Sequence, residues 1–253
     1  KFGDIWLAPK QGTDAALAMA MGHVILKEFH ATGKSAYFRD YAKQYTDFPM
    51  LVLLKERDGT LVPDYFLRAS HLANNLDESN NPEWKTLVID EASGRIVAPS
   101  GSIGFRWGES GKWNLEQKEG ATRNPIDPKL SLLDDHDRIV PVGFPYFGGQ
   151  DADDLLLRNV PVKSLTLADG TTALVTTVYD LSMANYGVDR GICPNAAKNY
   201  SDDVPYTPAW QVKHTGVKAE DVVTVAREFA DNADRTRGKS MVIVGAALNH
   251  WYH

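Results

Sequence analysis

The chain of 253 residues has a single cysteine, Cys193, and this scarcity excludes two kinds of protein. One thiol forms no internal disulfide, and alone it cannot hold an iron–sulfur cluster. Positive charge is also in short supply, because 27 Lys and Arg against 33 Asp and Glu give a net charge of −6. A mildly acidic chain without a basic block is a poor candidate for binding nucleic acid through its phosphates.

Long apolar runs are missing as well. The longest uncharged apolar stretch of interest, from Ala15 to Leu26, is much shorter than the ~20 residues that a helix needs to span a bilayer. We therefore expect no direct insertion into a membrane. The remaining composition, with 43% hydrophobic and 24% charged residues, is that of an ordinary globular protein and excludes disorder, collagen and a long coiled coil.

Both ends of the sequence read as interior parts of a longer polypeptide. The chain starts at Lys1 without a Met and enters a strand-like stretch, Asp4–Ala8, at once. It stops at His253, shortly after the apolar run Ser240–Val244, which is typical of a buried strand. Because a buried strand normally leads into a further element, we expect an internal piece of a larger protein.

Hydrophobic periodicity predicts an α/β fold in which parallel-sheet, dinucleotide-binding-like units are interrupted by a β-rich insertion. Residues 1–48 form the first α/β segment, in which the strand Asp4–Ala8 leads through a tight turn into a helix over Asp14–His30. Thr13 is the expected N-cap of this helix, and a second helix covers Ala36–Tyr45. Residues 181–253 form the second α/β segment, with a helix over Glu220–Ala233 before the strand Ser240–Val244.

The β-rich insertion, residues 49–180, consists of hairpins and long loops. Turn signals between short apolar runs predict three hairpins. Their turns lie at Asp58-Gly59, Ala92-Ser93-Gly94 and Asp169-Gly170. The Gly- and aromatic-rich stretches 101–108 and 143–149 read as irregular loops, and long irregular loops are usually functional or packed against a neighbouring domain.

The turn Gln11-Gly12-Thr13-Asp14 is the first candidate site, because it joins a predicted strand to the N-terminus of a helix. Backbone N–H groups at a helix N-terminus bind anions and nucleotides, and Gly12 allows a ligand to approach the backbone closely. Asp14 has an oxygen pair that can accept hydrogen bonds from a guanine edge or a ribose. The alternative interpretation is an ordinary capped helix start with no ligand.

The second candidate site follows the predicted strand Ser240–Val244. Gly245 ends that strand, and Asn249 and His250 come just beyond it. Open parallel sheets bind ligands outside the carboxyl ends of their strands, so these polar side chains are expected at a ligand-binding crevice. Two alternatives remain open at this point: a surface loop, and a metal-binding pair made by His250 and His253.

Motifs along the whole chain are those of a known family. They are Ala8–His23, Asn80–Lys85, Gly101–Gly108, Gly111–Gln117, Val142–Gly149, Ala173–Leu181, Arg227–Ala233 and Gly245–His253. In these motifs the chain resembles the catalytic α subunit of membrane-bound respiratory nitrate reductase, a member of the dimethyl-sulfoxide-reductase superfamily of molybdopterin oxidoreductases. The resemblance implies an internal piece of that subunit and of its larger molybdoenzyme fold.

The resemblance also implies a cofactor and the residues that face it. The family binds molybdenum bis(molybdopterin guanine dinucleotide) and carries an iron–sulfur cluster whose ligands lie outside this chain, as do the residues that bind molybdenum. Gly12, Thr13 and Asp14, with Gln11 adjacent, match the stretch that grips a guanine dinucleotide. The tail matches the cofactor-facing loop near the reaction centre, with Asn249 and His250 in the loop and Gly245 as its turn.

The implied function is reduction of nitrate to nitrite in anaerobic respiration. The expected partners are an iron–sulfur β subunit and a membrane haem γ subunit, which would hold the subunit on the cytoplasmic face of the cell membrane. The chain alone is expected to be inactive, because essential parts of the site lie outside it. Two alternatives remain: another oxidoreductase of the superfamily, acting on chlorate, selenate or a hydrocarbon, and a non-catalytic structural module.

Overall fold

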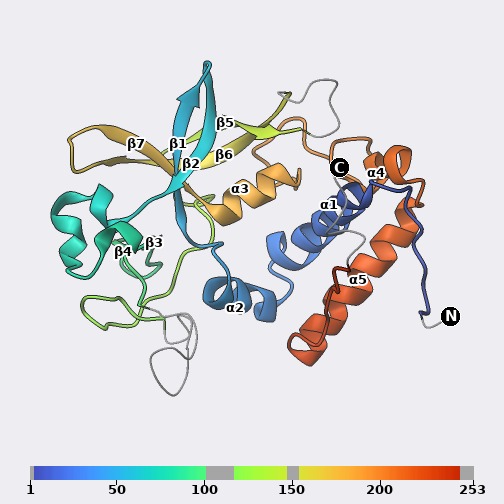
Figure 1. Ribbon diagram of the computed structural model, residues 1–253, viewed down its shortest axis with the longest axis horizontal. Helices are drawn as coiled ribbons and strands as arrows, with labels where there is room; N and C mark the ends of the chain where they lie inside the picture. The colour runs from blue at the N-terminus through green and yellow to red at the C-terminus, as the bar shows by residue number, and fades with distance from the viewer. Residues whose placement is uncertain (1–2, 101–116, 147–153, 246–253) are drawn as a thin grey trace. The chain divides into compact units, whose positions relative to one another are not determined.

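The computed structural model describes residues 3–100, 117–146 and 154–245, which together form a mixed α/β structure (Figure 1). The chain divides into two compact units. We call residues 1–39 and 183–253 the helical unit, and residues 40–182 the barrel unit. The mixed α/β class agrees with the sequence prediction, whereas the division into segments 1–48, 49–180 and 181–253 stays a prediction.

Five strands of the barrel unit close on themselves in the order β1-β2-β5-β6-β7. They are β1 (Leu51–Arg57), β2 (Thr60–Phe66), β5 (Arg138–Pro145), β6 (Leu155–Thr166) and β7 (Thr172–Thr177). Neighbouring strands are antiparallel, except that β2 and β5 are parallel and pair at Leu61 and Val142. Because β7 pairs with β1 as well as with β6, the barrel has no free edge at that side.

The three predicted hairpins are confirmed. Asp58-Gly59 joins β1 to β2, Asp169-Gly170 lies between β6 and β7, and a short antiparallel pair, β3 (Val88–Ile89) and β4 (Ile96–Val97), flanks the third turn. Gly59 and Gly170 have φ angles of +77° and +83°, a conformation that glycine adopts without strain. Because the turns require this conformation, the glycines at these two positions mark the turns in the sequence.

The loop predicted over residues 143–149 is wrong for its first part. Gly143 and Pro145 belong to β5 and pair with Leu157 and Leu155 of β6. Glycine, proline and aromatic residues suggested a loop, but the long partner strand β6 holds this stretch extended. Residues 147–149, like the other predicted loop at 101–108 and the motif 111–116, lie outside the described residues.

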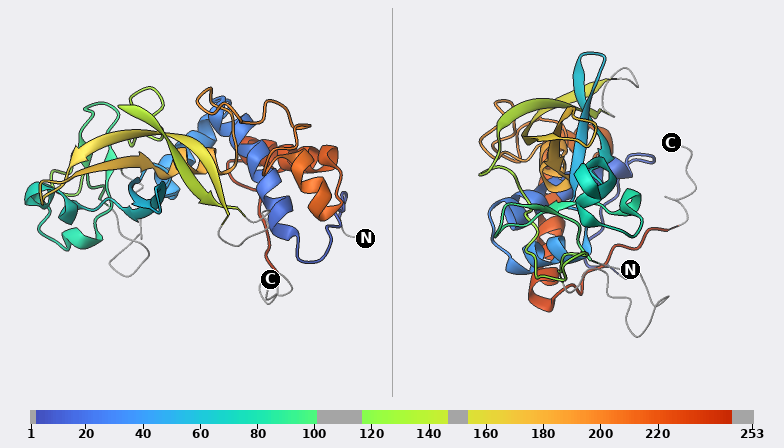
Figure 2. Two further views of the ribbon diagram at one scale, coloured as in Figure 1. Left: turned by 90° about the horizontal axis from the view of Figure 1, so that it is seen from above. Right: turned by 90° about the vertical axis from the view of Figure 1, so that its left-hand side faces the viewer.

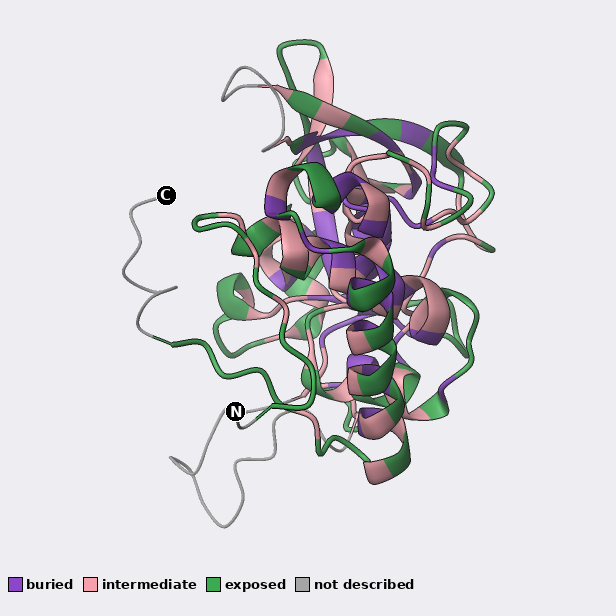
Figure 3. Ribbon diagram, turned by 90° about the vertical axis from the view of Figure 1, so that its right-hand side faces the viewer, coloured by how far each residue is buried: buried purple, intermediate pink, exposed green. Residues whose placement is uncertain are grey.

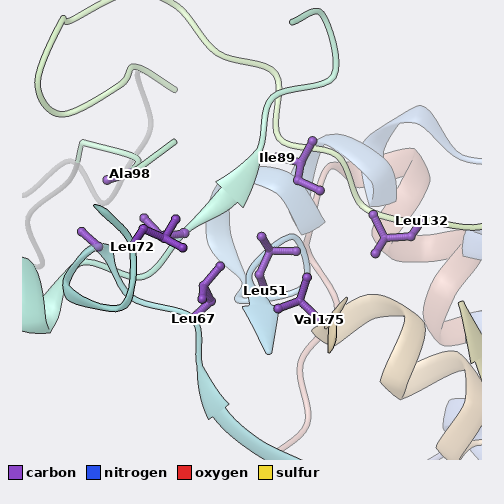
Figure 4. Packing of buried hydrophobic residues seen from close by; sticks show 9 residues of the cluster. Leu51, Leu67, Leu72, Ile89, Ala98, Leu132 and Val175 are labelled. Carbon is purple, nitrogen blue, oxygen red and sulfur yellow. The ribbon is translucent and has the colours of Figure 1, made fainter. Parts of the chain in front are cut away.

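A cluster of nine buried apolar side chains fills the barrel unit beside the β3–β4 pair (Figure 4). Leu51 of β1 and Val175 of β7 belong to the same cluster as Ala69 of the first of three short 3₁₀ helices, and Leu76 of the second packs against it. The 3₁₀ helices are Ala69–His71, Ala73–Asp77 and Pro82–Trp84. Full burial of a leucine or valine contributes about 1.5–3 kcal/mol relative to exposure, so this cluster is a main source of stability for the unit.

The helical unit is built on α1 (Asp14–Ile25), which continues as a π-helix over Leu26–Ala31. The prediction of one helix over Asp14–His30 is confirmed, with the change of helix type added. The other helices are α2 (Ala36–Tyr45), α3 (Val178–Asn185), α4 (Pro208–Thr215) and α5 (Ala219–Thr236). The bounds of α2 agree with its prediction. Along the chain, the division between the two units falls within α2 and within α3.

The helix α1 packs against both α4 and α5 (Figures 1 and 2). Val24 is fully buried and contacts the same cluster as Val223 and Ala226 of α5. Gly22 lies against the ring of Tyr186, and a Cβ atom at this position would overlap that ring. The close approach explains a glycine in the middle of a helix, where it otherwise costs stability.

The two strands predicted for this part of the chain are wrong. Neither Asp4–Ala8 nor Ser240–Val244 belongs to a strand, and the second segment leaves α5 as an exposed chain (Figure 3). Its apolar residues Ile243 and Val244 are 80% and 51% exposed. A strand needs a neighbour to receive its N–H and C=O groups, and among the described residues of the helical unit there is no strand to pair with.

A charged cluster fastens α1 to α5 at the π-helical turn. The Glu28 carboxylate accepts hydrogen bonds from Nε of Arg227 at 3.0 and 3.1 Å, from Nη2 at 2.6 Å, and from the Tyr200 hydroxyl at 2.8 Å. The hydrogen bonds from Arg227 hold the pKa of Glu28 below its usual value of 4.5. Because the folded state lowers this pKa, the cluster stabilises the fold above about pH 4.5 and loses its effect as pH falls further.

We expect Glu28→Gln to lower the free energy of unfolding by about 1 kcal/mol at pH 7, since it removes the charge that Arg227 pairs with. Urea unfolding at several pH values measures this. The difference from wild type should shrink as pH falls below 4.5, because Glu28 takes up a proton first in the unfolded protein and only at lower pH in the folded one. Glu228→Gln, at an exposed glutamate of α5, is the control and should change stability by less than about 0.5 kcal/mol. A pH-independent loss at Glu28 would contradict this assignment.

Candidate functional site

The turn Lys10–Asp14 presents its backbone to the solvent. Gln11, Gly12 and Asp14 are exposed, and Gly12 has a φ angle of +75°. Apart from its two chain neighbours, no atom of the described residues lies within 4 Å of the place where a Cβ of Gly12 would be, so the space beside this residue is open. A ligand can therefore approach the backbone of the turn without displacing a side chain.

The helix α1 starts without a side-chain cap. Thr13 is its N-cap residue, as predicted, but its hydroxyl donates to the carbonyl oxygen of Lys10 at 2.6 Å and caps none of the N–H groups. The φ and ψ angles of Thr13, −115° and 12°, differ from the extended conformation in which a threonine reaches the next turn. The positive end of α1 is left to solvent or to a ligand, and such an end favours anions.

The helix α4 borders this turn, a neighbour that the sequence did not indicate. The Lys10 N–H donates to the carbonyl oxygen of Thr215 at 3.0 Å, and a Cβ at Gly216 would lie 3.7 Å from Cε of Lys10. The aliphatic part of the Lys10 side chain therefore lies beside the end of α4, next to the exposed turn. The side chain thus runs along the C-terminal end of α4, where the helix dipole favours positive charge.

Two polar atoms of α4 are buried without a hydrogen-bond partner among the described residues. They are Nε1 of Trp210 and Nε2 of His214, whose ring centroids are 4.4 Å apart. Burial lowers the pKa of His214, and the charges of Lys213 and Lys10 lower it further, against an opposing effect of Asp203. A buried donor without an acceptor costs about 1–3 kcal/mol, so such atoms often mark incomplete surroundings.

Signals for α4 were nevertheless present in the sequence. Thr207 followed by Pro208 is a typical N-cap and first-turn pair, and Gly216 ends the helix with a φ angle of +77°. The Thr207 hydroxyl accepts a hydrogen bond from the backbone N–H of Trp210 at 3.1 Å. The helix was missed because its eight residues show little apolar periodicity.

Of the second candidate site, the structure describes Gly245 alone. Gly245 is exposed at the end of the described residues, and no hydrogen bond within that part of the chain joins it to the turn. Asn249 and His250, together with His253, lie outside the described residues. Their assignment therefore stays a prediction.

The described ranges contain neither a metal site nor a helix able to span a membrane. No group of three His, Cys, Asp or Glu side chains in these ranges is placed to hold a metal ion. Cys193 is a half-buried free thiol. In the same ranges, no helix combines the length and the apolar character that crossing a membrane requires.

Comparison with known proteins relates the chain to one group of enzymes along its whole length. It is 57% identical over 262 residues to the respiratory nitrate reductase 1 alpha chain of Escherichia coli (strain K12), covering 100% of this chain and 21% of that protein. It is 47% identical over 253 residues to the nitrate reductase alpha chain of Bacillus subtilis (strain 168), covering 100% of this chain and 20% of that protein. The chain is homologous to part of the nitrate reductase alpha chain. It spans about a fifth of the length of these relatives.

A more distant similarity extends to another oxyanion reductase. The perchlorate reductase subunit alpha of Dechloromonas aromatica (strain RCB) is 28% identical over 250 residues, which cover 99% of this chain and 20% of that protein. No family model matches the sequence. The higher identity places the chain nearer to the nitrate reductase alpha chains than to the perchlorate enzyme.

The two N-cap threonines of this alpha-chain segment should respond differently to replacement. Thr207→Ala should lower the free energy of unfolding by about 1–2 kcal/mol, because it removes a buried cap. Thr13→Ala should lower it by less than about 0.5 kcal/mol, because Thr13 caps nothing and its hydrogen bond is exposed. Urea unfolding of the two variants measures both values, and equal losses would show that Thr13 acts as an ordinary cap.

Proposed function

We propose that the chain is part of the catalytic subunit of a respiratory nitrate reductase, which reduces nitrate to nitrite in anaerobic respiration. The similarity to nitrate reductase alpha chains along the whole sequence supports this proposal. The observation that carries the role of this segment is the uncapped start of α1 in an open turn. The segment would supply part of the binding site for a cofactor, and essential parts of the reaction centre would come from elsewhere in the subunit.

The proposed cofactor is molybdenum bis(molybdopterin guanine dinucleotide). When bound, it supplies the two-electron oxygen-atom transfer chemistry that nitrate reduction needs. The residues of the turn fit the anionic part of such a group, because the N–H groups at the start of α1 have no side-chain cap and the space beside Gly12 is open. Gln11, Gly12 and Thr13 would line the approach to the helix.

Asp14 would hold the opposite end of the same dinucleotide. Its exposed carboxylate stands in the first turn of α1, where the helix dipole stabilises negative charge. A carboxylate accepts hydrogen bonds from the N–H groups of a guanine edge or from ribose hydroxyls. Asp14 would therefore recognise the nucleoside, while the backbone of the turn holds the phosphates.

Gly245, Asn249 and His250 would face the pterin and the reaction centre. The proposal rests on the motif they share with the family and on the polar side chains that follow an apolar run. Hydrogen bonds from an amide and an imidazole stabilise the charge of an oxyanion where it develops.

In the full-length enzyme, alanine at Asn249 or His250 should lower turnover about tenfold or more, and wild-type turnover in both would contradict the role.

Partners and location follow from the family. The subunit would assemble with an iron–sulfur β subunit and a membrane haem γ subunit, and would lie on the cytoplasmic face of the membrane through them. Its own iron–sulfur cluster would be held by residues outside this chain, and the segment would contribute no ligand to molybdenum. The segment would belong to dinucleotide-binding-like units of the larger fold, divided as 1–48, 49–180 and 181–253, with the last ending in a cofactor-facing loop.

A second candidate substrate has a specific observation behind it. The similarity to perchlorate reductase suggests that a related oxyanion could be reduced by the same kind of subunit. We favour nitrate because the nitrate reductase relatives are 47–57% identical and the perchlorate enzyme is 28% identical. A purely structural module is disfavoured by the open, uncapped turn, which has no evident purpose without a ligand.

A matched pair of glycine variants in the full-length subunit tests the cofactor site. Gly12 and Gly33 both have positive φ angles, +75° and +65°, and neither has an atom within 4 Å of its Cβ position. Alanine should therefore cost each position about the same, roughly 1 kcal/mol of backbone strain. Only Gly12→Ala places a methyl group where the ligand approaches. It should lower molybdenum and guanine content per protein about tenfold, roughly 1.4 kcal/mol, while Gly33→Ala leaves both unchanged.

Two results would reject this site. Full molybdenum and guanine content in Gly12→Ala would mean that the turn only starts a helix. An equal loss in Gly33→Ala would mean that content follows stability and not contact with the ligand.

A further inference from the structure

The outer face of the β5–β6 ribbon carries an apolar strip that the barrel does not cover. Ile139 of β5 and Leu155 and Leu157 of β6 are 40%, 46% and 56% exposed. The strand register places Leu157 beside Gly143 and Leu155 beside Pro145, whereas Ile139 pairs with Pro161 further along the ribbon. The apolar strip, as we call it, consists of Ile139, Pro141, Gly143, Pro145, Leu155 and Leu157.

Burial along β6 is the reverse of what its residue types favour. Arg158 is 4% exposed and lies on the same face of the strand as the buried Val160 and Val162. The leucines at 155 and 157 lie on the opposite, outward face. Burying a guanidinium group costs free energy, and a leucine that stays exposed lacks the stabilisation that burial would give it. The residue types on the outward face are therefore those of a surface in contact with protein and not with solvent.

The strip also differs from the exposed part of another barrel strand, β1. None of its six residues is ionisable, whereas the exposed end of β1 consists of Lys55, Glu56 and Arg57. Cγ2 of Thr60 and Cδ1 of Leu155 lie 2.9 and 3.0 Å from the Cβ position of Gly143, so these side chains cover the glycine. The half-buried Asn159, opposite Pro141, separates Ile139 from the two leucines. Small apolar surfaces are common on soluble proteins, so the reversed burial along β6, and not the area of the strip, points to contact with another part of a protein.

We propose that the apolar strip packs against another segment of the same alpha polypeptide, outside these 253 residues, and that the contacting surface of that segment is apolar and uncharged. The relatives are about five times as long as this chain, so four-fifths of such a subunit is available to cover the strip. The barrel unit would thereby be joined to the rest of the subunit through β5 and β6.

The size of the strip favours a segment of the same polypeptide over a separate protein. The strip covers about 23 Å of β5 and about 10 Å of β6, each roughly 5 Å wide, and so presents an area of about 160 Å². Stable contacts between separate proteins bury about 800 Å² on each side. A segment connected through the backbone loses much less translational and rotational freedom on packing, so a strip of this size is sufficient.

Photo-crosslinking in the purified full enzyme complex tests this proposal. The photoreactive residue p-benzoylphenylalanine replaces Leu157, or Leu155 in a second variant in case the first fails to assemble. The control replaces Asp58, whose side chain is 95% exposed at the β1–β2 turn. After irradiation, mass spectrometry identifies the crosslinked peptides, and gel electrophoresis separates crosslinks within one chain from those between chains.

The expected result is a crosslink at position 157 or 155 to an alpha-chain peptide outside these 253 residues, with the mobility of a single alpha chain. The yield should exceed that of the Asp58 control at least fivefold. A crosslink to a different subunit, to a second alpha chain, or to a peptide within the 253 residues would overturn the proposal. So would a yield no greater than that of the control, because the strip would then face water.

Discussion

The helical unit depends on the seating of α1 against α4 and α5. Apolar side chains pack along the middle of α1, and Glu28 binds Arg227 of α5 at its far end. At its near end, Lys10 donates to Thr215 of α4. Because both ends are fastened, the turn before α1 has a fixed place although its own residues are exposed. A helix held in this way can leave its first N–H groups uncapped, since packing and not capping stabilises it.

Elements with local signals, such as an amphipathic helix or a tight turn, could be predicted from the sequence, whereas strands that depend on a distant partner could not. The helix over Ala36–Tyr45 was predicted with the bounds that the structure shows, and hairpins were found from turns such as Asp58-Gly59. The segments Asp4–Ala8 and Ser240–Val244 have the residue types of strands but no neighbour to pair with. The types in Leu155–Arg158 even suggest the wrong face, because the environment that decides burial is not written in the strand itself.

In the candidate site, too, local features could be predicted from the sequence and contacts between distant residues could not. The position of Gly12-Thr13-Asp14 at a helix start could be predicted from the residues, and the structure agrees. That Thr13 fails to cap the helix depends on its backbone angles and on the carbonyl group of Lys10, which a pattern of residue types does not contain. The proximity of Lys10 to α4, about 200 positions further along the chain, is a result of folding and could not be predicted from spacing.

Exchange of the backbone amides at the start of α1 is the most direct test of the claim that they bind the cofactor. Hydrogen exchange would be followed in the full-length subunit purified with the molybdenum cofactor and from cells unable to make it. Bound cofactor should slow exchange at Asp14 and Ala15 about tenfold or more, while the start of α4, which Thr207 caps, remains unchanged. Equal exchange at the start of α1 with and without cofactor would contradict the account.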